Sequence, residues 1–199
     1  MSSLLFIRHT ETGMAGKFCG YSDPDLNERG LKQIAAVIRE LSDYPISRIY
    51  TSDLQRALQT AQPIVDHFHS KLEVRPGLRE IDFGLWEGLS WSEIETRYPV
   101  EARRWIDFHP NVAAPGGESY ERFQARVRQE IEFLIEKCSN ECIAVVTHAG
   151  FIREVLTRFC RVAGQEAWGK TKAYGAVISI DRDIVWDTLK LSVGLPAGQ

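Results

Sequence analysis

Three short strand-like segments, each ending at polar residues, constrain the fold of this chain most. They are residues 4–7, 46–50 and 142–146, and they end at Arg8-His9, Thr51-Ser52 and Thr147-His148. The first and third are continuously apolar, which is typical of a strand buried on both faces of a parallel sheet. The carboxyl ends of parallel strands share one edge of a sheet, so we expect these polar residues to share that edge.

Helical patterns separate the strand-like segments. Asn27 can cap a helix with an apolar face, Ser52 or Asp53 can cap one that runs roughly to His67, and Ser119 begins a long one. This alternation predicts an α/β fold, a three-layer α/β/α sandwich with a mostly parallel sheet. Residues 174–180 and 184–191 suggest a hairpin around 181–183, which would place an antiparallel strand at the sheet edge.

The length of 199 residues fits one domain, which we expect to span residues 1–199. Residues 84–116 interrupt the alternation with a group of aromatic side chains and three prolines, and they predict a helical, aromatic-rich insertion or lid. Two short helices are expected within it, near 91–98 and 101–108, with His109 in a loop. A further helix is expected from about 151 to 159.

Two histidines and two arginines would meet at the shared sheet edge if the three strands are neighbours: Arg8, His9, His148 and Arg56. A neutral imidazole can attack phosphorus and form a phosphohistidine. Guanidinium groups match phosphate oxygens and stay charged, and a second imidazole in its charged form can stabilise the transition state. The leaving oxygen needs a proton, which a nearby carboxylic acid could supply, and Glu80 is the best-placed candidate.

Five motifs around these residues resemble those of the histidine phosphatase superfamily, which is also called phosphoglycerate-mutase-like. Each motif is short, but together they follow the family's order over roughly residues 4–180. They are Arg8-His9-Thr10-Glu11-Thr12, residues 51–61 around Arg56, Glu80 with Phe83-Gly84-x-Trp86-Glu87-Gly88, Pro115-Gly116-Gly117-Glu118-Ser119, and Val146-Thr147-His148-Ala149-Gly150.

The resemblance implies a role for each matching residue. His9 would be the nucleophile, and Arg8, Arg56 and His148 would hold the phosphoryl group. Glu80 would protonate the leaving group and then activate water. The resemblance implies no metal and no cofactor, and no group of histidines and carboxylates in the sequence resembles a metal site.

The first motif departs from the family in one position. Many relatives carry an asparagine three residues after the Glu-Thr pair, where it contacts phosphate, and this sequence has Ala15 there. One polar contact is therefore missing or comes from elsewhere. Thr12, Ser52 or a backbone N–H could supply it.

Charge and hydropathy argue against several kinds of partner. The net charge of −3 gives no global basic field for nucleic acid, and the apolar segments are too short to cross a membrane. The beginning of the chain does not resemble a signal peptide, and its four cysteines form no C-x-x-C motif. We expect a cytoplasmic monomer or homodimer with reduced cysteines that acts on a small phosphorylated metabolite.

The resemblance favours a metal-independent phosphomonoesterase that works through a phosphohistidine intermediate. Several motifs most resemble α-ribazole-5′-phosphate phosphatases of cobalamin biosynthesis, and an aromatic insertion would suit a dimethylbenzimidazole ring. A broad-specificity sugar-phosphate phosphatase remains an alternative. So does a phosphoglycerate mutase, although such chains tend to be longer. A catalytically silent module that binds phosphorylated ligands is a third alternative.

Overall fold

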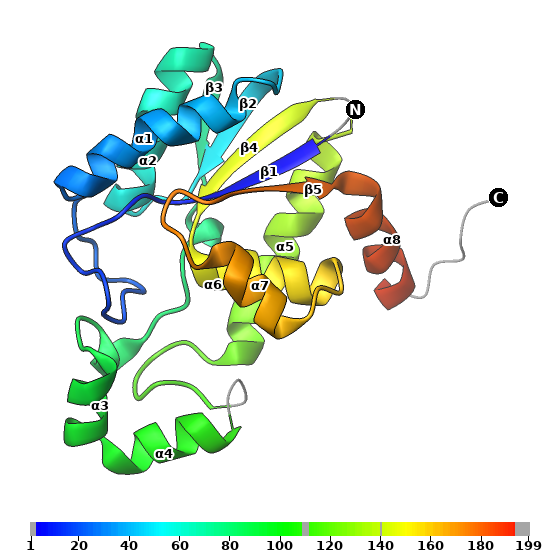
Figure 1. Cartoon of the computed structure of the whole chain (residues 1–199). Coiled ribbons are helices and arrows are strands. Elements are labelled where there is room, and N and C mark those ends of the chain that lie inside the picture. Colours follow the sequence, from blue (N-terminus) through cyan, green and yellow to red (C-terminus); the bar gives the residue numbers. More distant parts are fainter. Residues whose placement is uncertain (1–2, 109–111, 140, 194–199) are drawn as a thin grey trace.

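Five strands form one sheet in the order β3-β2-β4-β1-β5 in the computed structural model, which describes residues 3–108, 112–139 and 141–193 (Figure 1). Four strands are parallel, and β5 runs antiparallel to β1 at the edge. This confirms the predicted mostly parallel sheet with its antiparallel edge strand. The strands are β1 (Ser3–Arg8), β2 (Ile46–Thr51), β3 (Lys71–Val74), β4 (Cys142–Thr147) and β5 (Val177–Asp181).

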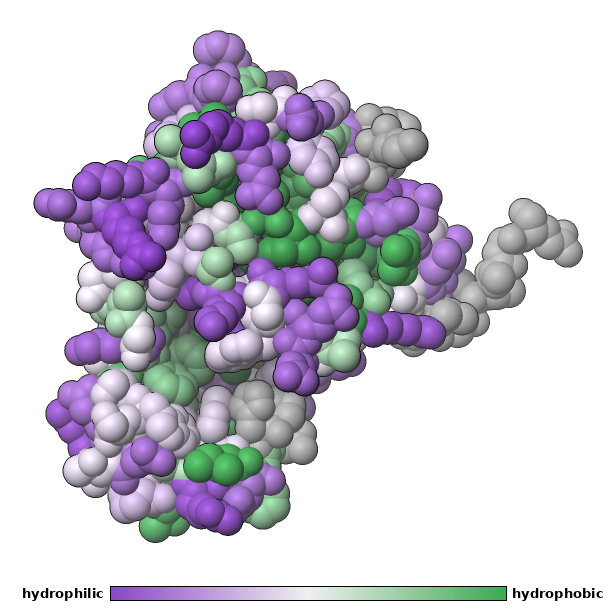
Figure 2. Space-filling model, in the orientation of Figure 1, coloured by the Kyte–Doolittle hydropathy of each residue, from purple (hydrophilic) through white to green (hydrophobic). Residues whose placement is uncertain are grey.

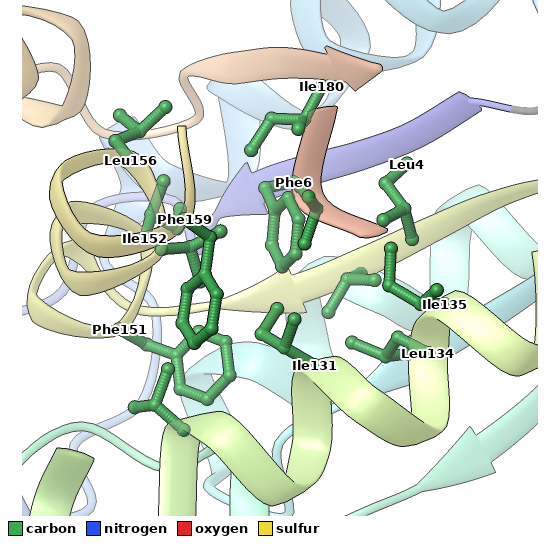
Figure 3. Close-up of a cluster of buried hydrophobic side chains, with 14 of the residues drawn as sticks. Leu4, Phe6, Ile131, Leu134, Ile135, Phe151, Ile152, Leu156, Phe159 and Ile180 are labelled. Atoms are coloured by element: carbon green, nitrogen blue, oxygen red, sulfur yellow. The ribbon is translucent and has the colours of Figure 1, made fainter. Parts of the chain in front are cut away.

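Helices cover both faces of the sheet, because alternate side chains of each central strand point into opposite cores. Leu5 and Ile7 of β1 pack in the core beneath α1 and α2, whereas Leu4 and Phe6 pack against α5 and α6 (Figure 3). Figure 2 shows mainly hydrophilic side chains over the outer side of α1. The covering helices are α1 (Glu28–Leu41) and α2 (Gln55–Phe68) on one face, and α5 (Tyr120–Lys137), α6 (Ala149–Glu154) and α8 (Arg182–Val193) on the other.

Two of the expected helix caps are present, and one is not. Asn27 Oδ1 accepts a hydrogen bond from Gly30 N at 2.8 Å, and Ser119 caps α5. Helix α2 begins at Gln55, after Leu54, and neither Ser52 nor Asp53 caps it. The reason is a tertiary contact, because the carboxylate of Asp53 accepts hydrogen bonds from the guanidinium of Arg79 instead.

The predicted C-terminal hairpin is wrong in its second half. Residues 182–193 form α8 rather than a strand. Val185 and Leu189, four residues apart, are both buried in the core on the α5 side, while Ile184 is exposed, which is a helical pattern. Helix α7 (Gly164–Thr171) has no counterpart in the prediction. The predicted helix at 151–159 corresponds to α6 followed directly by a π-helical segment, Val155–Phe159.

The aromatic insertion has a small core of its own. It contains α3 (Trp91–Arg97) and α4 (Pro99–Phe108), close to the two helices that the sequence predicts. Trp86 and Ile94 are buried in this core with Ala102 and Ala114. Residues 109–111, including His109, lie outside the described part of the chain. No helix of the described residues is long and apolar enough to cross a membrane.

Candidate active site

The polar residues that follow β1 and β4 lie side by side, as the sequence predicts. Arg8, at the end of β1, pairs with Thr147 at the end of β4, so the next residue of each strand is a histidine at the same level. The imidazole centroids of His9 and His148 are 5.2 Å apart. The parallel register of the central strands thus brings together segments that are far apart in the sequence.

The imidazole of His9 is buried and held in one tautomer. Its Nδ1 donates a hydrogen bond to the carbonyl oxygen of Thr10 at 2.8 Å, which leaves Nε2 unprotonated in the neutral ring. Burial, followed by the nearby charges of Arg56 and Arg8, holds the pKa of His9 well below its usual range. His9 lines a cavity, so it presents a neutral, nucleophilic nitrogen to whatever occupies that space.

The second histidine, His148, is fully buried directly behind His9. Neither of its ring nitrogens has a hydrogen-bond partner. Burial lowers the pKa of His148 well below its usual range, and the charges of Arg56 and Arg126 lower it further. Both effects favour the neutral form of the imidazole, so the charged form expected from the sequence needs a negative charge beside the ring.

Two arginines lie beside the histidines and are fixed by backbone carbonyl groups. Arg8 Nη1 donates to the carbonyl oxygen of Thr171 at 2.9 Å, and its guanidinium lies 3.9 Å from the ring centroid of Tyr174. Arg56 is fully buried and donates to the carbonyl oxygens of Ser22 and Gly20. The Nε atoms of both arginines are buried without a hydrogen-bond partner.

The carboxyl group of Glu80 lies on the wall of the same cavity. Its Oε2 accepts a hydrogen bond from Gly150 N at 2.8 Å, and its Oε1 accepts one from Ile81 N at 3.0 Å. A side chain at position 150 would clash with this carboxylate, so the glycine permits the close approach. This hydrogen bond therefore fixes the carboxyl group of Glu80 against the first turn of α6.

Thr12 and Ser52, the two side chains that could replace the missing asparagine contact, differ in their position relative to the cavity. Thr12 lines the cavity, and its Oγ1 accepts a hydrogen bond from Met14 N at 3.2 Å. Ser52 is fully buried, and its Oγ accepts a hydrogen bond from Leu54 N at 3.4 Å. Ser52 is absent from the described residues that line the cavity. Thr12 is therefore better placed than Ser52 to supply the contact that Ala15 cannot make.

The cavity has a volume of about 700 Å³ and a largely aromatic wall. Trp91 and Trp105 of the aromatic insertion contribute to this wall, whereas Trp86 is buried in the insertion's own core. The other aromatic side chains of the wall come from the first loop, the segment around Glu80, α5, α7 and the loop before β5: Phe18, Phe83, Tyr120, Phe123, Trp168 and Tyr174.

Three residues of the site were not found from the sequence. Tyr174 stacks on Arg8 from the loop before β5, and nothing in the sequence shows where that loop runs. Arg126 of α5 donates to the carbonyl oxygens of Arg79 and Glu80. Arg153 of α6 lines the cavity. Its place in the helix that follows the second-histidine motif was a signal that could have pointed to it.

Metal ligands do not cluster in the part of the chain described here: no group of three or more histidines, cysteines or carboxylates is arranged to hold a metal ion. The four cysteines are free thiols.

Comparison with known proteins agrees with this geometry. The chain is 31% identical, over its whole length and 96% of the relative, to phosphoserine phosphatase 1 of Hydrogenobacter thermophilus. It is 26% identical to the adenosylcobalamin/alpha-ribazole phosphatase of Salmonella typhimurium, over 94% of both chains. The solved alpha-ribazole phosphatase of Shigella flexneri superimposes with a TM-score of 0.80 at 25% identity, over 90% of both chains.

The family comparison covers almost the whole described structure. The model of the histidine phosphatase superfamily, branch 1, matches residues 4–184. That range begins in β1 and ends in α8, and it includes all five motifs. The chain therefore belongs to the histidine phosphatase superfamily, whose phosphatases hydrolyse small phosphoric monoesters.

Proposed function

We propose that this chain is a metal-independent phosphomonoesterase that passes the phosphoryl group through His9. The observation that carries the proposal is a set of buried donors without partners beside His9, namely Nε of Arg8, Nε of Arg56 and the ring of His148. Buried polar groups are almost always hydrogen-bonded, so an unpaired set beside His9 supports a bound ligand there. Of these residues Arg8 lines the cavity with His9, whereas Arg56 and His148 are absent from the described residues that line it. A phosphoryl group offers the acceptor oxygens that these donors lack.

The reaction we propose has two steps. Nε2 of His9 attacks phosphorus while the bond to the alcohol oxygen breaks, and Glu80 gives that oxygen its proton. Glu80 then takes a proton from a water molecule, which attacks the phosphohistidine and releases inorganic phosphate. Arg8 and Arg56 supply positive charge to the phosphoryl oxygens in both steps.

In this proposal His148 becomes protonated when the substrate binds. A phosphate dianion beside the ring raises the pKa of the imidazole, so the charged form arises only in the complex. Thr12 is the side chain that we place against the remaining phosphoryl oxygen. The aromatic insertion serves as a lid that keeps bulk water away from the leaving group.

Two substrates are supported by particular observations. The aromatic wall, with Trp91 and Trp105, favours an ester that carries a ring, such as α-ribazole-5′-phosphate of cobalamin biosynthesis. Phosphoserine is favoured by the relative from Hydrogenobacter thermophilus and by the charged group of Arg153 in the same wall.

Phosphate release tests the proposed function. The purified chain should release phosphate from at least one member of a panel containing α-ribazole phosphate, phosphoserine, sugar phosphates and p-nitrophenyl phosphate, with EDTA present. His9→Ala should abolish release. Loss of activity in EDTA, restored by a divalent metal, would refute the metal-independent mechanism.

The same panel, with 2- and 3-phosphoglycerate added, separates the alternatives. Transfer of phosphate between phosphoglycerates without release would identify a mutase. Phosphate release across the sugar phosphates at similar rates would identify a broad-specificity enzyme. Binding of phosphate esters with turnover equal to that of buffer would identify a silent binding module.

A further inference from the structure

Arg153 is a charged side chain in the cavity wall that the proposed chemistry does not use. It lies in α6, five residues after His148. Its Nε donates to the carbonyl oxygen of Ala149 at 3.1 Å, and its guanidinium lies 4.3 Å from the ring centroid of Trp168 in α7. These two contacts fix the plane of the guanidinium and leave its terminal nitrogens for another partner.

Arg153 has no ion-pair partner in the part of the chain that the structure describes. The carboxylate of Glu154 lies next in the chain. That carboxylate is already engaged, because it accepts hydrogen bonds from Tyr120 and Gln124 and pairs with Arg158. A half-buried arginine that faces a cavity without a counter-ion is costly unless a ligand supplies one.

Arg153 also lies close to the reaction centre. Burial lowers the pKa of its guanidinium, and the negative charge of Glu80 opposes that shift. The charge of Arg153 in turn lowers the pKa of Arg8. Arg153 and Glu80 line the same cavity, so an anion bound by Arg153 would share that space with the ester oxygen that Glu80 is proposed to protonate.

We propose that Arg153 is a specificity-determining residue that binds a carboxylate on the substrate, so that the enzyme prefers phosphate esters of small hydroxy acids. The inference rests on the proposed function and narrows its substrate class. The phosphoryl group already has Arg8 and Arg56, so a third fixed guanidinium is placed for a second anionic group. A carboxylate matches that flat fork in two parallel hydrogen bonds.

This subsite separates the two candidate substrates. Phosphoserine carries a carboxylate close to its ester oxygen, whereas α-ribazole phosphate carries none. The subsite therefore favours phosphoserine, the ester of a hydroxy acid. The aromatic wall would then enclose a short substrate rather than stack on a ring.

A matched pair of substrates tests this inference. O-phosphoethanolamine differs from O-phosphoserine only in lacking the carboxylate. The wild-type enzyme should have the higher kcat/KM for phosphoserine. Arg153→Gln should lower that value by about 10- to 100-fold, through KM, and change kcat/KM for phosphoethanolamine by less than about twofold. The kcat/KM of Arg153→Lys for phosphoserine should lie between those of the wild type and Arg153→Gln, because lysine keeps the positive charge but lacks the planar pair of N–H donors.

Arg158→Gln serves as the matched control. Arg158 lies one helical turn further along the chain with its side chain 47% exposed, so its loss should affect neither substrate. Equal loss of activity on both substrates in Arg153→Gln would show a structural role and overturn the inference. An unchanged kcat/KM for phosphoserine would also overturn it.

Failure of the proposed function gives a different result. A wild-type enzyme without activity on any ester, p-nitrophenyl phosphate included, would refute the phosphatase mechanism. Calorimetric binding of the same two esters to His9→Ala, with and without Arg153→Gln, would still decide the role of Arg153. Equal affinity for the two esters in His9→Ala would overturn it.

Discussion

The proposed mechanism places two opposing requirements on the side chains around His9. The imidazole of His9 has to be neutral to act as the nucleophile, while the phosphoryl group has to be held by positive charge. Burial together with the charges of Arg56 and Arg8 lowers the pKa of His9, and in the proposed mechanism the same two guanidinium charges stabilise the phosphoryl oxygens. The hydrogen bond to Thr10 then decides which ring nitrogen is free.

The depressed pKa values of His9 and His148 make stability depend on pH. In the unfolded chain these imidazoles titrate near 6.5, whereas folding keeps them neutral to well below that value. Below pH 6.5 the unfolded state binds more protons, so the free energy of unfolding falls as the pH falls. This contribution is fully present above about pH 6.5.

Urea unfolding at pH 7 and pH 5 measures this effect. The wild type should lose more free energy of unfolding between these two pH values than His148→Gln, which has one fewer buried imidazole. Carboxylates titrate in both proteins, so the comparison isolates the histidine. The same pH dependence in both would contradict the neutral, buried state of His148.

The role proposed for Glu80 depends on the leaving group. Glu80→Gln cannot donate a proton, so kcat on alkyl phosphates should fall by about 100-fold or more. p-Nitrophenolate leaves without protonation, and its release should be much less affected. Steady-state rates on both substrates, with unfolding temperature as a control, test this. Equal slowing of the two would remove Glu80 from the acid role.

At the scale of secondary-structure elements, one arginine connects α5 to the segment that carries the proposed acid. Arg126 donates to the carbonyl oxygens of Gly77, Arg79 and Glu80, and it forms an ion pair with Glu118 at 2.7 Å. The segment has no regular structure beyond a short 3₁₀ turn, so this guanidinium fixes its path. Arg126 is therefore a positioning residue for Glu80.

Removal of this connection should disturb the acid more than the nucleophile. Arg126→Ala should lower kcat on alkyl phosphates by about tenfold and the free energy of unfolding by about 2–4 kcal/mol, because carbonyls and a carboxylate lose their partner. Hydrolysis of p-nitrophenyl phosphate should change less.

Arg128→Ala is the matched control for Arg126→Ala. Arg128 lies on the same helix and forms an ion pair with Glu132 at the surface, and such pairs contribute little to stability. Similar losses in the two variants would show that the Arg126 contacts do not position Glu80.

The sequence alone correctly predicted the elements whose apolar pattern is local. It was not enough to predict elements and site residues that depend on tertiary contacts. Residues 4–7 and 142–146 predicted buried strands because both of their faces are covered. Residues 184–191 misled because an apolar segment can alternate and still pack as a helix, as Val185 and Leu189 do. Tyr174 lines the site only because of the path of the chain between α7 and β5, which no local pattern specifies.

For the molecule as a whole, the site is a consequence of topology. The order β3-β2-β4-β1-β5 places β1 between β4 and β5, so the ends of β1 and β4 are adjacent in the middle of the sheet. A chain with a net charge of −3 thereby places two arginine side chains, Arg8 and Arg56, beside His9 and His148. The family match over residues 4–184 covers this whole arrangement.

The covalent intermediate tests the central claim most directly. Wild-type enzyme is mixed with a ³²P-labelled substrate in EDTA, quenched in alkali within milliseconds and digested for mass spectrometry. The account predicts an acid-labile, alkali-stable phosphoryl group on His9, which is absent from His9→Ala and chased by unlabelled substrate. Turnover that proceeds while the quenched protein carries no phosphoryl group, or carries it on another residue, would contradict the account.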